Sequence, residues 1–269
     1  MFIGEKLIYL QLPKTGCTHI AALLAETIEG EQIKKHNILT EYEKGKKIIG
    51  SVRNPWSWYV SLWAYGCEGK GDIYPMLAKK SVYRVVRKLY RQGIAEAFYE
   101  AVKPTGTWRE AYSDSNDPTC FQKWLKKMYA PRTRFSLPKD YHEYNLSEFA
   151  GYYTHRYALL HLRNYYKKDV RKMISSYNDL FEYDRENSIL DHVIRTESIE
   201  EDLVNVLRLC GYDSPEIERR IVGSRGSKTN KSQHMGTGFY YNEETIQLVA
   251  ERERLIVEKY GYEPPEIVN

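Results

Sequence analysis

The sequence predicts an α/β protein with a central parallel sheet flanked by helices, and three observations lead to this fold class. Lys6–Leu12 alternates and branches like a short buried strand, and an apolar helical pattern follows it directly. The same strand-then-helix order recurs at Lys46–Val52 and in the segment that begins at Pro55. The 269 residues are enough for one large core. Strand–helix–strand order then implies parallel strands joined by right-handed crossovers.

The first quarter of the chain carries the clearest elements. After the first strand, helical spacing of apolar residues predicts a helix over Cys17–Glu29. Gln32–His36 is a short segment of extended character. The helix that begins at Pro55 has proline in its first turn and an aromatic face, "WSWYVSLW", so we expect its tryptophans to pack in the core: Trp56, Trp58 and Trp63.

The rest of the chain alternates helical patterns with loops. The predicted helices are Lys79–Val102, Thr119–Tyr129, Ser147–Leu162, Ile199–Cys210 and Glu243–Tyr260, and the remaining strand is Asp191–Glu197. Two segments without periodicity, Lys103–Pro118 and Gly223–Gly238, are predicted to be loops. No linker divides the chain, so residues 1–269 are expected to form one domain in which residues 68–145 are a variable insertion.

Composition excludes several classes of protein. The 40 Lys and Arg against 36 Asp and Glu leave a net charge of +4, which is too mild to indicate a nucleic-acid partner by itself and fits a local basic site better, so we expect no nucleic-acid partner. The four cysteines form no CxxC pair, which argues against a zinc site and against a disulfide framework: Cys17, Cys67, Cys120 and Cys210. No secretion signal and no apolar run of about 18 residues is present, so we expect a cytoplasmic protein without a membrane partner.

The stretch "LPKTGCTHI", residues 12–20, joins the first strand to the first helix. A strand–loop–helix unit aims backbone N–H groups and the positive end of the helix dipole at one point, which favours an anion. Lys14 adds a mobile cation, and Thr15 and Thr18 add hydroxyl donors. The loop therefore predicts an anion site.

A second stretch, "VRNPWSWYVS", gives a second anion site. Arg53 leaves the strand, and Ser61 follows eight residues later on the succeeding helix. Since eight residues are just over two helical turns, Ser61 is expected to face Arg53 and to share one phosphate with it. Sites in such sheets lie beyond the carboxyl ends of the strands, so the two stretches predict a ligand with two separated phosphate-like groups.

These two stretches resemble the 5′-phosphosulfate loop and the 3′-phosphate motif of sulfotransferases that use 3′-phosphoadenosine 5′-phosphosulfate (PAPS), most closely the carbohydrate-type branch. Weaker similarity continues through "IRTESIEEDL", "TNKSQH", "YYNEETIQLV" and "KYGYEPP". The resemblance implies a single P-loop-like domain that takes PAPS as cosubstrate, releases PAP and uses no metal. It also implies in-line transfer of a sulfonate to a hydroxyl acceptor, chosen by residues 68–145.

The resemblance also assigns residues. Those expected to bind the nucleotide are Lys14, Thr15, Gly16, Cys17, Thr18, His19, Arg53 and Ser61, with Arg225, Lys228 and Lys231 of "GSRGSKTNKS" closing over it. The loop departs from the family pattern, because many members carry a second glycine and then Ser or Thr where this chain has Cys17, Thr18 and His19. "GSRGSKTNKS" itself stands where cytosolic members carry a basic glycine-rich motif.

Catalysis of sulfonate transfer requires stabilisation of the leaving group and a base for the acceptor hydroxyl. Lys14 is the expected catalytic cation. His36 is the expected general base, because related carbohydrate sulfotransferases often place a histidine or glutamate at this position; the alternative for His36 is an ordinary surface histidine. Glu41 and Glu43 are the next candidates.

Two other functions fit the same residues. A P-loop kinase also uses a strand–loop–helix unit with Lys and Thr, although the GxxxxGK[ST] spacing is missing here. A noncatalytic binder of nucleotides or sulfated glycans is the other alternative. The acceptor is left open, since basic helices favour an anionic glycan and 24 tyrosines favour a neutral sugar or a phenol. The sequence gives no indication of oligomeric state.

Overall fold

The computed structural model describes residues 1–41, 45–131, 133, 136–224 and 234–268. Within these residues one mixed sheet has the order β3-β1-β2-β4-β5. Its strands are β1 (Phe2–Gly4), β2 (Leu7–Tyr9), β3 (Gly30–Gln32), β4 (Lys47–Val52) and β5 (His192–Arg195). The α/β class is thus confirmed.

The direction of the strands differs in part from the expected parallel sheet. β4 runs parallel to both β2 and β5, whereas β1 pairs antiparallel with β2 and with β3. The reason is local: only Glu5 and Lys6 separate β1 from β2, and so short a connection can join only antiparallel strands.

Helices account for most of the remaining described residues. They are α1 (Cys17–Thr27), α2 (Pro55–Cys67), α3 (Ile73–Ala78), α4 (Val82–Arg91), α5 (Ile94–Val102), α6 (Thr105–Glu110), α7 (Pro118–Tyr129), α8 (Lys139–His142), α9 (Leu146–Phe149), α10 (Tyr152–His161), α11 (Lys168–Met173), α12 (Tyr177–Asn187), α13 (Ile199–Leu209), α14 (Pro215–Gly223), α15 (Glu243–Arg252) and α16 (Arg254–Tyr260). Across the described part of the chain, none is long and apolar enough to cross a membrane.

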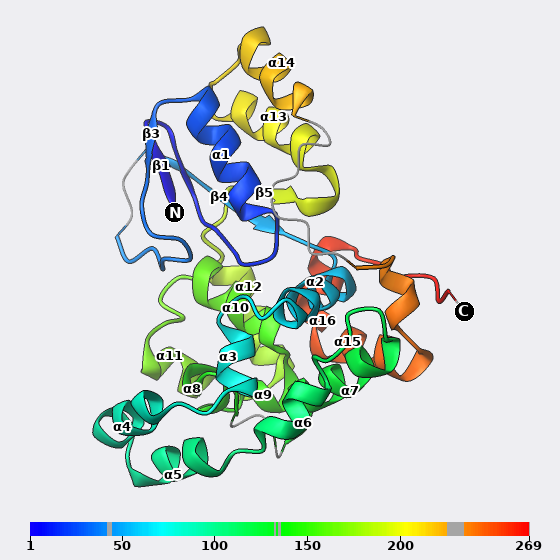
Figure 1. Cartoon of the computed structure of the whole chain (residues 1–269). Coiled ribbons are helices and arrows are strands. Elements are labelled where there is room, and N and C mark those ends of the chain that lie inside the picture. The colour runs from blue at the N-terminus through cyan, green and yellow to red at the C-terminus, as the bar shows by residue number, and fades with distance from the viewer. Residues whose placement is uncertain (42–44, 132, 134–135, 225–233, 269) are drawn as a thin grey trace.

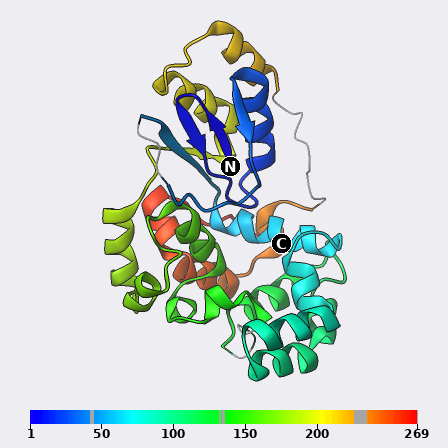
Figure 2. The ribbon, with the colours of Figure 1, turned by 90° about the vertical axis from the view of Figure 1, so that its left-hand side faces the viewer.

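The molecule has a sheet end and a helical end. Figure 1 shows the sheet with α1, α13 and α14 at the top and the other helices below. Both views place α2 between the two ends, directly below the sheet (Figures 1 and 2). The described residues of segment 68–145, which contains α3 to α8, lie in the helical end.

Several predicted helices are interrupted. The helix expected over Lys79–Val102 is divided into α4 and α5 at Gly93, whose φ of 108° does not belong to a helix. The helix expected over Glu243–Tyr260 is divided at Glu253, and the predicted loop Lys103–Pro118 contains α6. The chain therefore changes direction more often than apolar spacing indicates.

The sheet buries both faces. Leu7 and Tyr9 pack with α1 and α13, whereas Ile8 and Leu10 pack on the opposite face with Ile48. This alternation is the period-two pattern of a strand with two covered faces. The strand that leads into the stretch at residues 12–20 is therefore buried on both faces.

The helical end has an aromatic core. All five tryptophans are at most 1% exposed: Trp56, Trp58, Trp63, Trp108 and Trp124. The Trp58 ring stacks on Tyr153 with centroids 4.5 Å apart, and the Trp58 indole N–H donates to the Pro13 carbonyl at 2.8 Å. The expected core role of the α2 tryptophans is confirmed, and Trp58 also holds the loop before α1.

Candidate functional site

The two predicted anion loops are in contact. β2 and β4 are parallel neighbours, so their carboxyl ends lie side by side at one edge of the sheet. The Lys14 loop follows β2 and Arg53 follows β4 directly. The Arg53 guanidinium (Nη1) donates to the Lys14 carbonyl oxygen at 3.2 Å. Two chain segments nearly forty residues apart in sequence thus form one site with two cations.

Lys14 is held in an unusual conformation. Its φ of 65° is in the left-handed region, which costs a residue with a Cβ free energy and occurs often at functional sites. The ammonium lies 4.0 Å from the centroid of the half-buried Tyr65 ring of α2. Burial, helped by the neighbouring Arg53 cation, lowers the pKa of Lys14 to about 8. A bound anion would stabilise the charged form of Lys14 and would offset the repulsion between Lys14 and Arg53.

Gly16 shapes the start of α1. Its φ is 71°, and a Cβ at this position would lie 2.6 Å from Ile199 Cδ1, so only glycine fits. Gly16 is also the N-cap, and no side chain caps the helix. No acidic residue occupies the first turn. The first N–H groups of a helix have no partner within it, so here they are left for an anion.

The Thr15 hydroxyl serves the fold. It is fully buried and donates to the Leu12 carbonyl at 2.7 Å, so it accepts from Ser51 Oγ at 2.6 Å. Ser51 in turn accepts from the Tyr9 hydroxyl at 2.7 Å. The expected hydroxyl donor at Thr15 is therefore used inside the protein, and Thr15 offers a ligand only its backbone N–H.

Arg53 has a different hydroxyl partner from the expected one. Its Nε donates to Ser57 Oγ at 2.8 Å, whereas Ser61 is 5% exposed and forms no hydrogen bond with Arg53. Ser57 is one turn from Arg53. The side chain of Asn54, the N-cap of α2, accepts a hydrogen bond from the Ser57 backbone N–H. The backbone N–H of Arg53 donates to the Tyr153 hydroxyl at 2.9 Å. The predicted Arg53–Ser61 pair is thus an Arg53–Ser57 pair.

The remaining loop residues divide into two groups. Thr18 is half-buried and accepts from Lys35 Nζ at 3.2 Å, and its hydroxyl also forms a hydrogen bond with the Cys17 side chain. Cys17 and His19 are buried, and burial raises the pKa of the Cys17 thiol. His19 Nε2 faces Glu200 of α13 at 3.6 Å. The side chains of Cys17 and His19 therefore pack inside the protein, so at these positions only the backbone N–H groups are left for the predicted nucleotide contact.

His36 lies beside the Lys14 loop. It has a φ of 59°, and its Nδ1 is 2.6 Å from the carbonyl oxygen of Gln11, three residues before Lys14. A carbonyl only accepts, so Nδ1 carries the proton and Nε2 is the basic nitrogen. Burial lowers the pKa of His36, and the Arg156 and Lys35 cations lower it further. His36 is therefore neutral at pH 7.

Of the other predicted residues, Glu41 is exposed. Glu43, Arg225, Lys228 and Lys231 lie outside the described residues.

Sequence reasoning missed three side chains of this site. Tyr65 covers the Lys14 ammonium, and its place on α2 follows from no motif. Glu197 accepts from the Asn54 backbone N–H at 2.8 Å and faces Arg53 electrostatically. Arg156 of α10 is half-buried, and its charge acts on His36. Of the three, only Glu197 could have been found from the sequence, because it lies in "IRTESIEEDL", a stretch with weaker similarity to the sulfotransferases.

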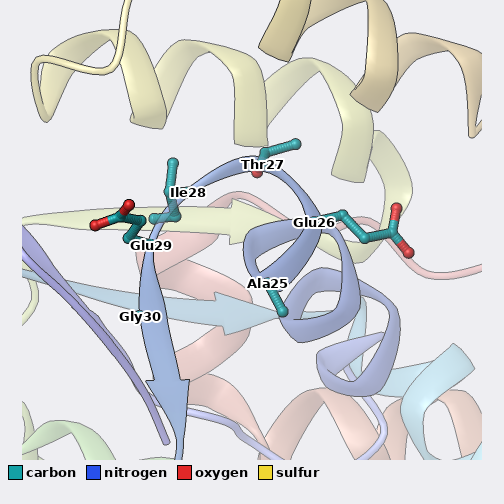
Figure 3. Close-up of a pocket in the computed structure, with 6 residues that line it drawn as sticks. All are labelled: Ala25, Glu26, Thr27, Ile28, Glu29 and Gly30. Atoms are coloured by element: carbon teal, nitrogen blue, oxygen red, sulfur yellow. The ribbon is translucent and has the colours of Figure 1, made fainter.

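A surface hollow lies away from these loops. Figure 3 shows it at the C-terminal end of α1, where its lining runs from Ala25 to Gly30. Glu26 and Glu29 add carboxylates to the negative end of the helix dipole, which disfavours an anion. The predicted site lies at the other end of the same helix.

Comparison of the chain with known protein families, with curated proteins and with solved structures gave no match. Within the described ranges, no group of three or more His, Cys, Asp or Glu is placed to hold a metal ion.

Proposed function

We propose that the protein is a PAPS-dependent sulfotransferase that transfers a sulfonate to a hydroxyl acceptor, a carbohydrate being the class that the resemblance suggests. One observation carries the proposal: the Lys14 loop and Arg53 touch at the carboxyl ends of β2 and β4. In this proposal β2, β4 and β5 form the parallel part of a P-loop-like fold.

The residues present fit a ligand with two phosphate-like groups. Lys14 and the first N–H groups of α1 would hold the phosphosulfate, and the Arg53 guanidinium would hold the 3′-phosphate, oriented by Ser57 Oγ, whose own proton goes to the Asn54 carbonyl. When bound, PAPS supplies the sulfonate, and negative charge builds on its bridging oxygen. The half-buried Lys14 ammonium is placed to stabilise that charge, because burial weakens solvent screening.

His36 would accept the proton of the acceptor hydroxyl at Nε2. Its Nδ1–H bond to the Gln11 carbonyl fixes the tautomer and the ring orientation. Because Gln11 belongs to the same segment as Lys14, this contact sets the base relative to the cation. The acceptor would approach from the His36 side.

The test is calorimetry of PAP binding in EDTA, with AMP as the ligand that lacks the 3′-phosphate. We expect PAP to bind and AMP to bind much more weakly. Arg53→Ala should weaken PAP about 10- to 150-fold, because loss of a charge-assisted contact costs about 1.5–3 kcal/mol. Arg185→Ala removes an exposed arginine of α12 and should leave PAP binding unchanged.

Three results would count against the proposal. Absence of PAP binding, or equal binding of AMP, would remove the two-phosphate interpretation. Binding of ATP only with Mg²⁺ would favour the kinase alternative. Tight PAP binding with no product in an acceptor screen, read by mass shift with labelled PAPS, would favour the noncatalytic binder.

A further inference from the structure

The helical hairpin formed by α4 and α5 is strongly basic. Residues 79–103, here called the basic hairpin, contain seven Lys or Arg and two Glu, a net charge of +5. The whole chain has a net charge of +4, so the rest of the molecule carries one net negative charge. The positive excess of the protein is therefore located in this one hairpin.

The two helices pack through charged side chains. Glu100 of α5 is 1% exposed and accepts from Arg84 Nε at 2.8 Å and Lys103 Nζ at 2.7 Å. Lys88 Nζ of α4 is 3.1 Å from the other Glu100 oxygen. No residue of α4 is buried. The hairpin is thus held by ion pairs on its inner face.

Apolar side chains face solvent instead. On α4 the exposed apolar residues share one face, opposite the ion pairs: Val82, Tyr83, Val86, Leu89 and Tyr90. On α5 they recur every four residues: Ile94, Phe98 and Val102. Val82 and Tyr90 are 81% and 85% exposed, so they project from the surface. This is the reverse of the usual arrangement of a surface helix.

The basic hairpin lies at the tip of the helical end. Figure 1 shows α4 and α5 at the bottom of the molecule, opposite α13 and α14, and Figure 2 shows the same two helices at the lower edge. Exposed arginines continue the apolar face of α4, at Arg87 and Arg91. The tip therefore presents apolar side chains bordered by cations.

We propose that the basic hairpin docks on the surface of an anionic lipid bilayer. Its apolar side chains would enter the boundary between headgroups and acyl chains, with Tyr83 and Tyr90 at headgroup level and the cations on anionic headgroups. The hairpin's net charge of +5 complements an anionic membrane. The expectation of no membrane partner rests on the absence of a spanning segment, which a surface-bound helix does not need.

Other occupants fit the tip less well. An anionic glycan would pair with the cations but would leave Val82, Ile94 and Phe98 without apolar partners. A second copy of the chain would bring two hairpins of charge +5 together. A bilayer satisfies both the apolar face and the charge.

The test is co-sedimentation of the full chain with vesicles of phosphatidylcholine alone and with phosphatidylserine added. We expect binding that requires phosphatidylserine. Arg87→Ala with Arg91→Ala should weaken binding about 25-fold, since each cation contributes about fivefold. Lys123→Ala with Lys126→Ala removes the same charge from α7 and should have little effect.

A second pair of variants tests the apolar contact. Phe98→Asp should reduce binding at least tenfold, whereas Leu209→Asp, at an exposed apolar residue of α13, should leave it unchanged. Equal binding to both kinds of vesicle, no binding, or wild-type binding by Phe98→Asp would overturn the proposal. So would retention on an anionic-glycan column without vesicle binding, or concentration-dependent dimers that Phe98→Asp abolishes. None of these readouts depends on sulfotransferase activity.

Discussion

The molecule concentrates cations in two places that are built in opposite ways. Lys14 and Arg53 are half-buried at the edge of the sheet, and the backbone of one loop is bonded to the side chain of the other. In the basic hairpin the cations are either paired on Glu100 or exposed. One arrangement suits a discrete anion and the other an extended surface.

The difference is electrostatic. Half-buried charges are screened less than exposed ones, so Lys14 and Arg53 would act strongly on the anion that we propose they bind. The same burial makes the empty site unfavourable for charge, and the pKa of Lys14 is lowered to about 8. Each exposed cation contributes little by itself, and the effect becomes large only when several act together. Changes at the two places should therefore differ greatly in size.

The largest effect is expected at His36. His36→Ala should lower turnover by about 10²–10⁴, the usual contribution of a general base, with PAP affinity nearly unchanged. Burial lowers the pKa of His36, so the base is protonated only below its ordinary value of 6.5, and activity should fall as the pH drops through that lower range. Rate profiles of both proteins with labelled PAPS provide the measurement.

A matched control is available at His192, a half-buried histidine of β5. His192→Ala should keep most of the turnover and the acidic limb of the profile. If His36→Ala also keeps both, the base is another residue, and Glu41 and Glu43 are the remaining candidates.

A somewhat smaller effect is expected at Lys14. Lys14→Ala should lower turnover by about 10²–10³, as loss of one preorganised donor to a developing anion does, and should weaken PAP less. Lys14→Arg should restore little, because the planar, delocalised guanidinium does not replace the compact charge of an ammonium. Equal losses of turnover and of PAP affinity would make Lys14 a binding residue only. Lys123→Ala, at an exposed position of α7, is the control.

The sequence located the elements near the site well. Proline at the start of α2 and apolar spacing in α1 are local signals, and both helices begin at the expected residues. The contact between the two loops follows from parallel pairing of β2 and β4, which the strand–helix order indicates. The helix starts depend on residues close in the sequence, and the strand pairing follows from the order of the elements, so one sequence is enough to predict both.

What the sequence did not reveal depends on side-chain direction and on distant packing. Helical spacing made Ser61 a candidate partner of Arg53, but Ser57, one turn away, is the hydroxyl that Arg53 reaches. Thr15 reads as a free donor, yet its proton is used by Leu12. Tyr65 and Arg156 reach the site through the packing of α2 and α10, which no short motif encodes.

Two buried carboxylates, Glu253 and Glu100, differ in the direction of their pKa shifts, and this difference affects the stability of the fold. Burial raises the pKa of Glu253 to about 7, and hydrogen bonds from Thr154, Tyr59 and Tyr129 only partly oppose it. Burial acts in the same direction on Glu100, but bonds from Lys103, Arg84 and Lys88 lower its pKa overall. A raised pKa means that the folded state holds the proton more tightly than the unfolded chain.

Stability should therefore fall as the pH rises from about 4.5 to about 7, by about 3 kcal/mol from Glu253. Glu253→Gln should remove this component. Denaturant unfolding at several pH values gives the difference between the two proteins, which should change across that range and be constant above it. A difference that is flat with pH would contradict the assignment, and exposed Glu251→Gln should give such a flat result.

The smallest effect is expected in the basic hairpin. Phe98 is 67% exposed, so Phe98→Ala should change the free energy of unfolding by less than about 0.5 kcal/mol. Phe121 of α7 is fully buried between Trp63 and Tyr240, and Phe121→Ala should cost about 3–5 kcal/mol. Denaturant midpoints of the two variants measure the contrast. A cost at Phe98 approaching that at Phe121 would mean that the hairpin face is part of the folded core, and its exposed apolar residues would then need no partner.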